Sequence, residues 1–367
     1  MPETGKDGAG VIEFEEIYQR STARKLTVIA ILLILLIVIL LVSTATGVAG
    51  ITVSDVARVI VSKIIPGLQL ATISELAEVI VVELRLPRIF LAILAGFSLA
   101  GAGAVKQSVL RNPLVSPFTL GISAGASLGA AIAIVMGKSV LGSSFVVAGK
   151  YLIVCNAFLF GMITMLLIYG IAKIKGAIPE TLILAGVALG YLFQAGVSSL
   201  KYFSDHEALK DLVVWLMGGL WGATWETVLI LLPIVLICLL LLERHTWDLN
   251  ALSAGEEVAK SLGVNVDRLR LTTLILATLM ASSTIAFTGI IGFIGLVSPH
   301  LCRFLVGSDN RFLLPAAALM GAVLLLLADT LARIVLAPVE LPVGILTSLI
   351  GAPFFLYLLL RKKQLHW

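Results

Sequence analysis

The chain has 367 residues, of which 59% are hydrophobic and only 13% are charged. Because a soluble domain has about 45–50% apolar and about 25% charged residues, this composition excludes an ordinary soluble protein and predicts that membrane lipid surrounds much of the chain. The formal net charge of +4 fits an excess of Lys and Arg in cytoplasmic loops, so no nucleic-acid partner is expected.

The chain begins with a polar, acidic segment, 1–25, which we interpret as a cytoplasmic N-terminal tail. After it, apolar runs recur that are long enough to cross a bilayer as helices, since about 20 apolar residues span the hydrocarbon core. About ten such runs occur, at 27–47, 88–107, 117–136, 151–172, 180–200, 226–242, 271–290, 292–306, 312–336 and 343–360. The sequence therefore predicts an all-α polytopic membrane protein with about ten transmembrane helices, in which 26–363 form one membrane domain.

Small residues occur at close intervals in several of these runs, for example from Ala100 to Gly103. They let membrane helices approach closely, which predicts a tightly packed bundle. If the N-terminus is cytoplasmic, ten spans return the C-terminus to the cytoplasm, and most Lys and Arg residues then lie inside, as expected for membrane proteins. The outer side keeps some basic residues, among them Arg85, Arg88 and Arg333.

A short internal repeat is visible. Leu114-Val115-Ser116-Pro117 recurs as Leu296-Val297-Ser298-Pro299, each copy beside a glycine-rich span. In the predicted orientation the first copy faces inward and the second outward. This is the pattern of an inverted repeat, which is common in transporters.

The longest polar stretch after the N-terminal segment is the loop 244–270, on the predicted inner side. Within it, 253–264 is typical of a short amphipathic helix: Ser253 is a suitable N-cap, Glu256 completes a capping box, and Gly263 suits a left-handed C-cap. Such a helix is either solvated between two spans or a knob that fits a socket on a cytoplasmic motor subunit.

Several motifs carry a resemblance to a known family. Glu257-x-Ala259-x-x-x-Gly263 resembles the core of the cytoplasmic loop in permeases of ABC importers. Over about 84–360, further motifs resemble, in the same order, the permease family that imports iron-siderophores, haem and cobalamin. They are Leu84-Arg85-Leu86-Pro87-Arg88, Arg111-Asn112-Pro113-Leu114, Leu120-Gly121-Ile122-Ser123-Ala124-Gly125-Ala126, Trp215-Leu216-Met217-Gly218-Gly219, Gly292-Phe293-Ile294-Gly295-Leu296-Val297-x-Pro299-His300, Asp329-Thr330-x-Ala332-Arg333, Glu340-Leu341-Pro342-Val343-Gly344 and Gly351-Ala352-Pro353-Phe354. The N-terminal segment shows no such match.

The resemblance implies a transmembrane permease domain over 26–363 that works as a homodimer, with the translocation path between the two copies. It implies a location in the cell membrane and two kinds of partner, namely two cytoplasmic ABC ATPase subunits and an extracytoplasmic substrate-binding protein. The implied cargo is an iron(III)-siderophore or a related metal chelate. Cobalamin and haem are alternatives with the same architecture, and an oxyanion such as molybdate also stays open.

Three sets of candidate residues follow. For ATPase coupling they are Gly255, Glu256, Glu257, Ala259, Leu262 and Gly263. For docking of the binding protein they are Arg85, Arg88 and Arg333, because Arg binds carboxylates bidentately. The alternatives for these are snorkelling to lipid headgroups and, for Arg333, an ion pair with Asp329 at i, i+4.

The third set is the translocation path. A bulky polar chelate needs small and weakly polar walls that do not hold it tightly. The candidates are Ser123, Ser127, Gln194, Ser198, Ser199 and, at a glycine pair predicted to move as the outer end opens, Met217. The alternative for the serines is hydrogen bonding between helices.

No enzyme activity or cofactor is predicted in the chain itself. A nucleotide-binding phosphate loop needs Gly-x-x-x-x-Gly-Lys-Ser/Thr, and the nearest fragment, 137–139, has Ile132 in place of the first Gly. ATP and Mg would therefore bind a separate ATPase subunit. The His and Cys residues are scattered without metal-ligand spacing, so no metal site is expected.

The main alternative of another class is an ion-coupled secondary transporter. Such proteins usually carry ionisable residues at mid-membrane to bind the coupling ion. The predicted spans are almost free of such residues, and the exception, Asp329, has Arg333 one helical turn later. This spacing favours a structural ion pair over a proton relay.

Overall fold

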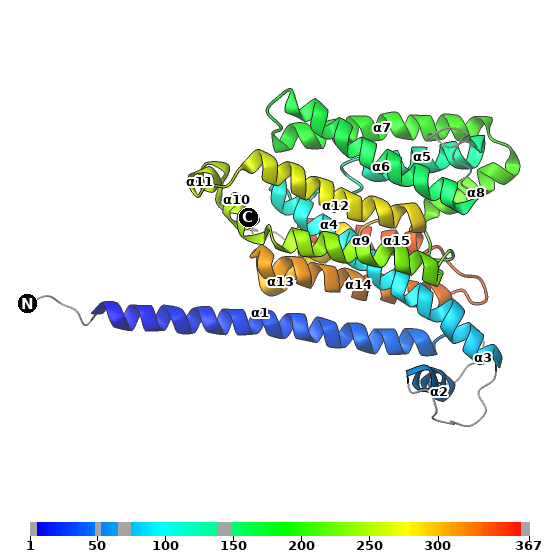
Figure 1. Cartoon of the computed structure of the whole chain (residues 1–367), viewed down its shortest axis with the longest axis horizontal. Coiled ribbons are helices and arrows are strands. Elements are labelled where there is room, and N and C mark those ends of the chain that lie inside the picture. The colour runs from blue at the N-terminus through cyan, green and yellow to red at the C-terminus, as the bar shows by residue number, and fades with distance from the viewer. Residues whose placement is uncertain (1–5, 48–52, 65–74, 138–148, 361–367) are drawn as a thin grey trace, which may run out of the picture.

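The computed structural model describes residues 6–47, 53–64, 75–137 and 149–360, and every regular element in this part is a helix (Figure 1). The elements are α1 (Lys6–Ala45), α2 (Val53–Ile64), α3 (Glu75–Val79), the π-helix η1 (Ile80–Arg85), α4 (Leu86–Val109), α5 (Ile122–Met136), α6 (Lys150–Lys173), α7 (Pro179–Phe203), α8 (His206–Met217), α9 (Trp225–Glu243), α10 (Thr246–Ala254), α11 (Glu256–Ser261), α12 (Val266–Thr288), α13 (Ile294–Val306), α14 (Asn310–Ile334) and α15 (Val343–Leu360).

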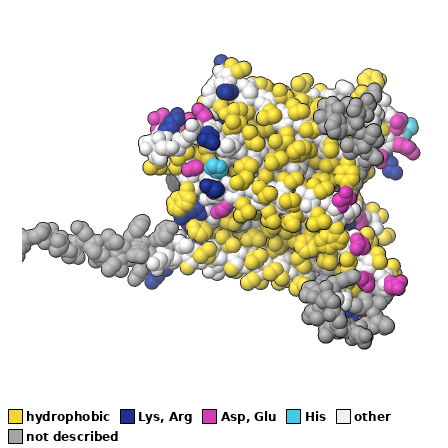
Figure 2. All heavy atoms as spheres, viewed as in Figure 1, with side chains coloured by type: hydrophobic (Ala, Val, Ile, Leu, Met, Phe, Trp, Pro, Cys, Tyr) yellow, Lys and Arg dark blue, Asp and Glu magenta, His cyan; other side chains and the backbone are white. Residues whose placement is uncertain are grey.

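The helices lie roughly along one direction, which gives the bundle two ends (Figure 1). One end, called the α11 end below, carries α10, α11 and the N-terminal part of α1. The opposite end, called the α8 end, carries α2, α3 and α8. Hydrophobic side chains cover the face between the two ends, whereas charged side chains gather toward the ends (Figure 2).

The predicted fold class is confirmed. In the described residues, seven helices are long and apolar enough to cross a membrane, and α5, α13 and α15 are shorter apolar helices. Each of the ten predicted runs falls on one of these helices. The sequence did not predict that α1 begins at Lys6 and continues without a break into the first span, so residue 25 is not an end of secondary structure.

Helix α4 lies at the centre and packs against α14, α12, α13 and α9. Its glycines bring backbones into contact: a Cβ at Gly96 would lie 2.5 Å from the backbone of Gly321 and Ala322, and one at Gly103 would overlap the carbonyl of Gly295. Apolar burial gives little drive for helix association in lipid, so close van der Waals packing has to supply it. The predicted tight bundle is therefore built on backbone contact.

A second layer is formed by α5, α6 and α7, and α6 contacts α12 of the central layer. Here too small residues permit the approach, because a Cβ at Gly129 would lie 2.3 Å from the carbonyl of Asn156. The outer face of α7 leaves Leu184, Tyr191 and Leu192 exposed. Large apolar side chains exposed on a membrane protein are expected to meet lipid or another apolar surface.

Helices α5 and α13 are too short to cross a bilayer alone. With 15 and 13 residues, they are about 20 Å long, against about 30 Å of hydrocarbon. Each follows a non-helical segment, and the two segments meet where Gly295 lies beside Pro117 and the Leu99 carbonyl. Non-helical backbone at membrane depth is tolerated where protein surrounds it or where it lines a cavity, which marks this region as a candidate site.

The two copies of Leu-Val-Ser-Pro differ in conformation. The first, 114–117, lies in a turn closed by hydrogen bonds between Ser116 and Thr119, whereas the second, 296–299, lies within α13. An inverted repeat of the whole bundle stays a prediction.

We expect Gly96→Ala to lower the free energy of unfolding by about 1–3 kcal/mol, because the added methyl group meets rigid backbone rather than a flexible side chain. Thermal unfolding in detergent would measure the loss. Gly170→Ala on α6 is the matched control, since no atom lies within 4 Å of a Cβ at that position. Equal stability of the two variants would contradict the role of backbone contact between α4 and α14.

Candidate functional site

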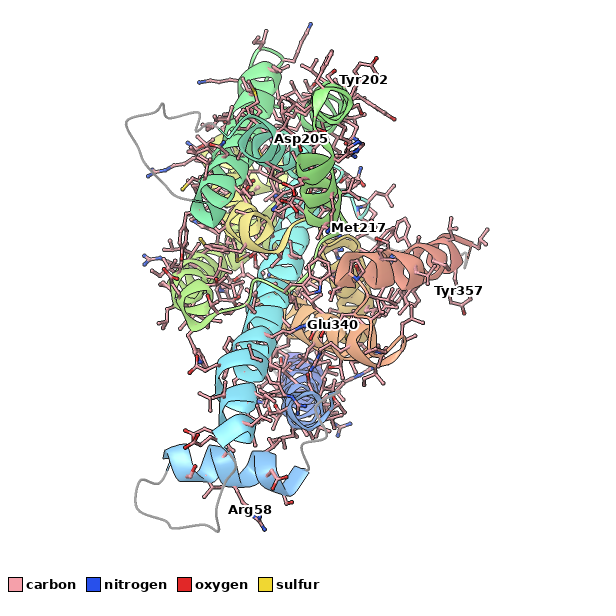
Figure 3. All side chains as sticks on the ribbon, turned by 90° about the vertical axis from the view of Figure 1, so that its right-hand side faces the viewer. Arg58, Tyr202, Asp205, Met217, Glu340 and Tyr357 are labelled. Carbon is pink, nitrogen blue, oxygen red and sulfur yellow. The ribbon has the colours of Figure 1, made fainter. Side chains whose placement is uncertain are left out.

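A cavity of about 750 Å³ lies beside the non-helical segments. Its walls come from the 116–119 turn, the C-terminal end of α8, the segment 290–296 and α15. The lining residues are Ser116, Phe118, Thr119, Leu216, Met217, Ile290, Gly292, Phe293, Leu296, Gly344, Ile345, Ser348, Leu349, Ala352 and Pro353. In Figure 3, which looks onto the α8 end, Met217 lies at the end of α8 that faces α15.

The chemistry of this lining is apolar with a few hydroxyl groups. The described lining residues include no ionisable side chain, and Ser116, Thr119 and Ser348 are its polar side chains. The Ser348 hydroxyl donates to the Gly344 carbonyl at 2.7 Å, and the Ser116 and Thr119 groups bond within their own turn. Because these groups already have partners, the wall can contact a bulky cargo without binding it tightly.

Three backbone segments converge at one side of the cavity. The amide of Gly344 donates to the Gly218 carbonyl at 3.2 Å, and the amide of Gly219 donates to the Thr288 carbonyl at 2.8 Å. Gly218 has a φ of +68°, and a Cβ on it would lie 2.1 Å from the Ile290 carbonyl oxygen. We call 217–219, 288–290 and 343–344 the glycine junction. The glycine pair predicted from the sequence thus permits close contact here, and its movement stays a prediction.

Of the residues predicted to line the translocation path, some line this cavity and others do not. Met217 lines the cavity. Ser123 and Ser127 do not, because both are buried inside the chain and the Ser127 hydroxyl donates to the Ser123 carbonyl along α5. They do not line this cavity, and their predicted place on a path between two copies stays a prediction.

The remaining predicted path residues, Gln194, Ser198 and Ser199, lie on the exposed face of α7 and outside the cavity lining. Their role on a path between two copies stays a prediction. Sequence reasoning missed Ser116, Phe293 and Ser348 as lining residues. Ser116 and Phe293 stand in motifs that interrupt helices. This interruption was the signal in the sequence that could have identified them as lining residues.

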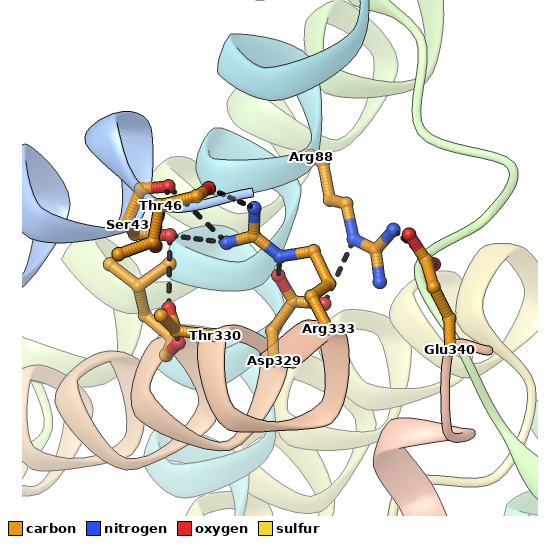
Figure 4. Close-up of polar contacts among 8 residues, drawn as sticks. Ser43, Thr46, Arg88, Asp329, Thr330, Arg333 and Glu340 are labelled. Carbon is orange, nitrogen blue, oxygen red and sulfur yellow. Dashed lines mark hydrogen bonds and ion pairs between the residues drawn. The ribbon is translucent and has the colours of Figure 1, made fainter. Parts of the chain in front are cut away.

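The α8 end holds a buried network of ion pairs (Figure 4). Arg88 donates to Asp329 at 2.9 Å and to Glu340 at 2.7 Å, and Arg333 lies 3.1 Å from the other oxygen of Asp329. The Asp329 side chain is 0% exposed. A buried carboxylate is tolerated only when its charge is paired. The two guanidinium groups therefore compensate the charge of the buried Asp329 side chain. The predicted ion pair between Asp329 and Arg333 is confirmed.

Arg333 of this network and the neighbouring Arg85 also bind the end of α1. Arg85 donates to the Thr44 carbonyl at 2.7 Å, and Arg333 donates to the Ser43 hydroxyl at 2.6 Å. The last carbonyls of a helix have no partner within the helix, and cations are favourable at this negative end of the helix dipole. The two arginines therefore cap α1 and connect it to η1 and α14.

These contacts bear on the predicted docking of the binding protein. Docking through Arg85, Arg88 and Arg333 requires free guanidinium groups at the surface. In the structure, Arg85 and Arg333 are each 7% exposed, and all three already have partners within the chain. The sequence cannot reveal this, because the partners Ser43 and Thr44 are far away along the chain. Docking through these groups stays a prediction that would require breaking the internal contacts.

The predicted coupling helix is in fact two helices. Gly255, with a φ of +135°, separates α10 from α11. Ser253 is therefore not an N-cap, and its hydroxyl donates to the Leu249 carbonyl in the last turn of α10. The predicted C-cap at Gly263 is confirmed by its φ of +84° and by the hydrogen bond from the Val264 amide to the Ala259 carbonyl.

A buried arginine fixes α11 to the bundle. Arg270 donates to Glu256 at 3.2 Å and to the Ala177 carbonyl at 3.0 Å. Partial burial by itself raises the pKa of Glu256, but hydrogen bonds from Lys260 and Arg270 outweigh it and hold the pKa of this carboxyl below its ordinary value. The contact is therefore complete at neutral pH and is lost only as the pH falls through that lowered pKa.

The candidate coupling residues of α11 and its C-terminal cap have two different roles. Ala259 is buried and Glu256 is paired, so these two hold α11 in place. Glu257 and Leu262 are exposed at the α11 end. A partner subunit would therefore meet Glu257 and Leu262.

Comparisons with known proteins agree with this architecture. Residues 34–361 match the model of the FecCD transport family. A protein of Methanocaldococcus jannaschii named as an ABC transporter permease is 50% identical over 78% of this chain and 83% of its own length. The Fe(3+)-citrate import permease of Bacillus subtilis is 45% identical, over 77% of this chain and 82% of its own. A solved structure assigned to the metal-chelate type of ABC transporters, in an inward-facing conformation, has a TM-score of 0.78 and 34% identity, covering 91% of this chain and 99% of that one.

We expect Asp329→Asn to destabilise the fold by about 3–5 kcal/mol, because it leaves the buried Arg333 without a carboxylate and leaves Arg88 with Glu340 alone. Thermal unfolding in detergent would measure it. Glu340→Gln is the matched control: its side chain is 37% exposed, so its loss should cost about 0–1 kcal/mol. A larger loss in the control than in Asp329→Asn would contradict the central place of Asp329 in the network.

Proposed function

The chain belongs to the FecCD transport family and is a permease subunit of an ABC importer, and from that premise we propose that it carries an iron(III)-siderophore or a related iron chelate into the cell. The observation that carries the cargo proposal is the cavity, which is large and apolar and has no ionisable side chain in its described lining. Such a wall suits a bulky chelate that must be released again. Relatives named for Fe(3+)-citrate and for hemin support this class of cargo.

We propose that the subunit works as a homodimer with two ATPase subunits at the α11 end and a binding protein at the α8 end. The exposed apolar face of α7 and the exposed side chains of α15, among them Leu349 and Ile350, support a second copy as their cover. Exposed Glu257 and Leu262 on α11 support the place of the ATPase. ATP and Mg then bind that separate subunit.

The orientation follows from charge. The α11 end exposes many basic side chains, which are Arg20, Arg24, Arg111, Lys173, Lys175, Arg244, Lys260 and Arg268. Cytoplasmic segments of membrane proteins carry an excess of Lys and Arg. We therefore place the α11 end, and the N-terminus with it, in the cytoplasm.

The secondary-transporter alternative loses its candidate ion site. Asp329 is the carboxylate singled out in the predicted spans, and it is already paired with Arg88 and Arg333 near the end of α14. A carboxylate fixed between two guanidinium groups is poorly suited to take up and release a coupling ion. Haem and cobalamin stay as alternative cargoes within the same architecture.

Reconstituted uptake tests the proposal. The permease would be assembled in liposomes with the ATPase and binding protein of its own system, and uptake of ⁵⁵Fe(III)-hydroxamate chelate, haemin and cobalamin would be compared. We expect ATP-dependent uptake of the iron chelate. Uptake driven by a proton gradient without ATP would overturn the ABC mechanism, and ATP-driven uptake of cobalamin or haemin alone would overturn the iron-chelate cargo.

Two substitutions test coupling at α11. We expect Glu257→Lys to reduce uptake about tenfold or more, which corresponds to about 1.4 kcal/mol, because it reverses an exposed charge at the ATPase surface. Gly263→Val should uncouple hydrolysis from uptake by straining the left-handed cap. Glu180→Lys, exposed at the same end but on α7, is the matched control and should transport normally. Normal uptake by the Gly263→Val complex would count against this assignment.

A further inference from the structure

A small polar pocket lies at the α11 end, beside the last turn of α4. Its volume is about 30 Å³, which gives room for about two water molecules or for one small polar group of a ligand. Its walls come from the end of α4, the last turn of α10, α13 and the turn after α13. The lining residues are Gln107, Ser108, Arg111, Ser253, Arg303 and Ser308. The pocket shares no lining residue with the apolar cavity described above.

The chemistry of this lining favours an anion. Every lining side chain is polar, and the described lining includes two guanidinium groups and no carboxylate. The carboxylate nearest along the chain belongs to Asp309. It accepts from Arg311 at 2.7 Å and from Asn250 at 2.8 Å, so it is already engaged. The described walls therefore contribute positive charge and no negative charge, which disfavours a cation in the pocket.

A buried amide group in the pocket wall needs an acceptor. The Gln107 side chain lies in a residue that is 1% exposed, and its Oε1 accepts a hydrogen bond from Arg303. Because a guanidinium group can only donate, this contact fixes the amide with its oxygen toward Arg303. The Gln107 Nε2 is buried and has no hydrogen-bond partner among the described residues. A buried donor without a partner is costly, and a ligand oxygen in the pocket would satisfy it.

Arg111 supplies a guanidinium group at the mouth of the pocket. It follows the end of α4 with a φ of +48°, and it is exposed, as is Ser308. With the described part of the chain, its side chain makes no hydrogen bond or ion pair. The Ser108 and Ser253 hydroxyls, in contrast, already bond to other groups of the chain. The charged group that solvent reaches at this pocket is therefore that of Arg111.

We infer that this pocket is a binding site for one phosphate-type oxyanion, held by Arg111, Arg303 and the Nε2 of Gln107. Guanidinium groups bind phosphate oxygens bidentately through a planar fork of donors, and the amide adds a donor inside the pocket. A free phosphate ion and the phosphate headgroup of a lipid both carry this chemistry. The inference goes beyond the proposed function and does not depend on which cargo is carried.

The bound oxyanion connects segments that carry α11. Arg111 follows α4 and Arg303 lies on α13, so one ligand bridges the ends of these two helices. Ser253 of the lining lies shortly before Gly255, which separates α10 from α11. The oxyanion therefore stabilises the α11 end of the bundle against separation of α4 from α13, at the place where α10 packs on α4.

Direct binding tests the inference. The full-length permease in maltoside micelles, a detergent without phosphate, would be titrated with radiolabelled orthophosphate, and we expect saturable binding at one site per chain. Arg111→Gln should weaken binding about tenfold or more, because it removes a guanidinium donor. Gln107→Glu should abolish binding, because its carboxylate repels the oxyanion and occupies Arg303. Arg244→Gln, exposed at the same end but outside the lining, is the matched control and should bind orthophosphate like the unaltered protein.

Competition distinguishes the two sources of phosphate. Unlabelled orthophosphate and short-chain phosphatidic acid would be compared as competitors of the label, with short-chain phosphatidylcholine as the lipid control. Displacement by orthophosphate at the lower concentration assigns the site to free phosphate. Displacement by phosphatidic acid at the lower concentration assigns it to a lipid headgroup. Either result supports the inferred oxyanion site.

Three results would overturn the inference. They are the absence of saturable binding of orthophosphate and of phosphatidic acid, unchanged binding in both Arg111→Gln and Gln107→Glu, and equal displacement by phosphatidylcholine, which would indicate that acyl chains act rather than phosphate. Thermal unfolding without phosphate should give the same midpoint for Arg111→Gln as for the unaltered protein, because its side chain is exposed. Added phosphate should raise the midpoint of the unaltered protein and leave that of Arg111→Gln nearly unchanged.

Discussion

Backbone contact around α4 is the constraint on which the rest of the structure depends. Lipid solvates apolar side chains as well as the protein interior does, so helices in a bilayer gain little from apolar burial. The glycines at 96, 103, 295 and 321 let α4, α13 and α14 meet without side chains between them. That contact fixes how near the short helix α13 comes to α4. It thereby determines where the non-helical segments must lie and where the cavity is left between them.

Buried charge adds a second constraint at the α8 end. Asp329 lies within α14 with its side chain removed from solvent, and two arginines from α4 and α14 compensate it. Arg333 of this network also binds the end of α1, whose Leu32, Leu36 and Ile39 are buried in the core beside α14. Packing of α1 thus combines an apolar face with polar contacts at one end, whereas α4 relies on close backbone contact with its neighbours.

The sequence predicted the spans well and the faces of the helices poorly. Span length and composition are local properties, so every predicted run coincides with a helix. Which side of a span points inward depends on an apolar-polar contrast around the helix, and α5 and α7 are apolar or small on nearly all sides. The burial of Ser123 within the chain could therefore not be predicted, and the partner of Arg85 could not be found because it lies on another span. Ser253 has the right residues for a capping box, but Gly255 interrupts the helix before that box can form.

The length of α1 has a geometric consequence for the assembled transporter. A helix of 40 residues is about 60 Å long, roughly twice the hydrocarbon thickness of a bilayer. Its N-terminal part extends past the rest of the bundle at the α11 end (Figure 1). A subunit seated against α11, as proposed above, would therefore meet the projecting part of α1 on one flank. In a twofold-symmetric assembly, the two copies of α1 would flank the ATPase subunits on opposite sides.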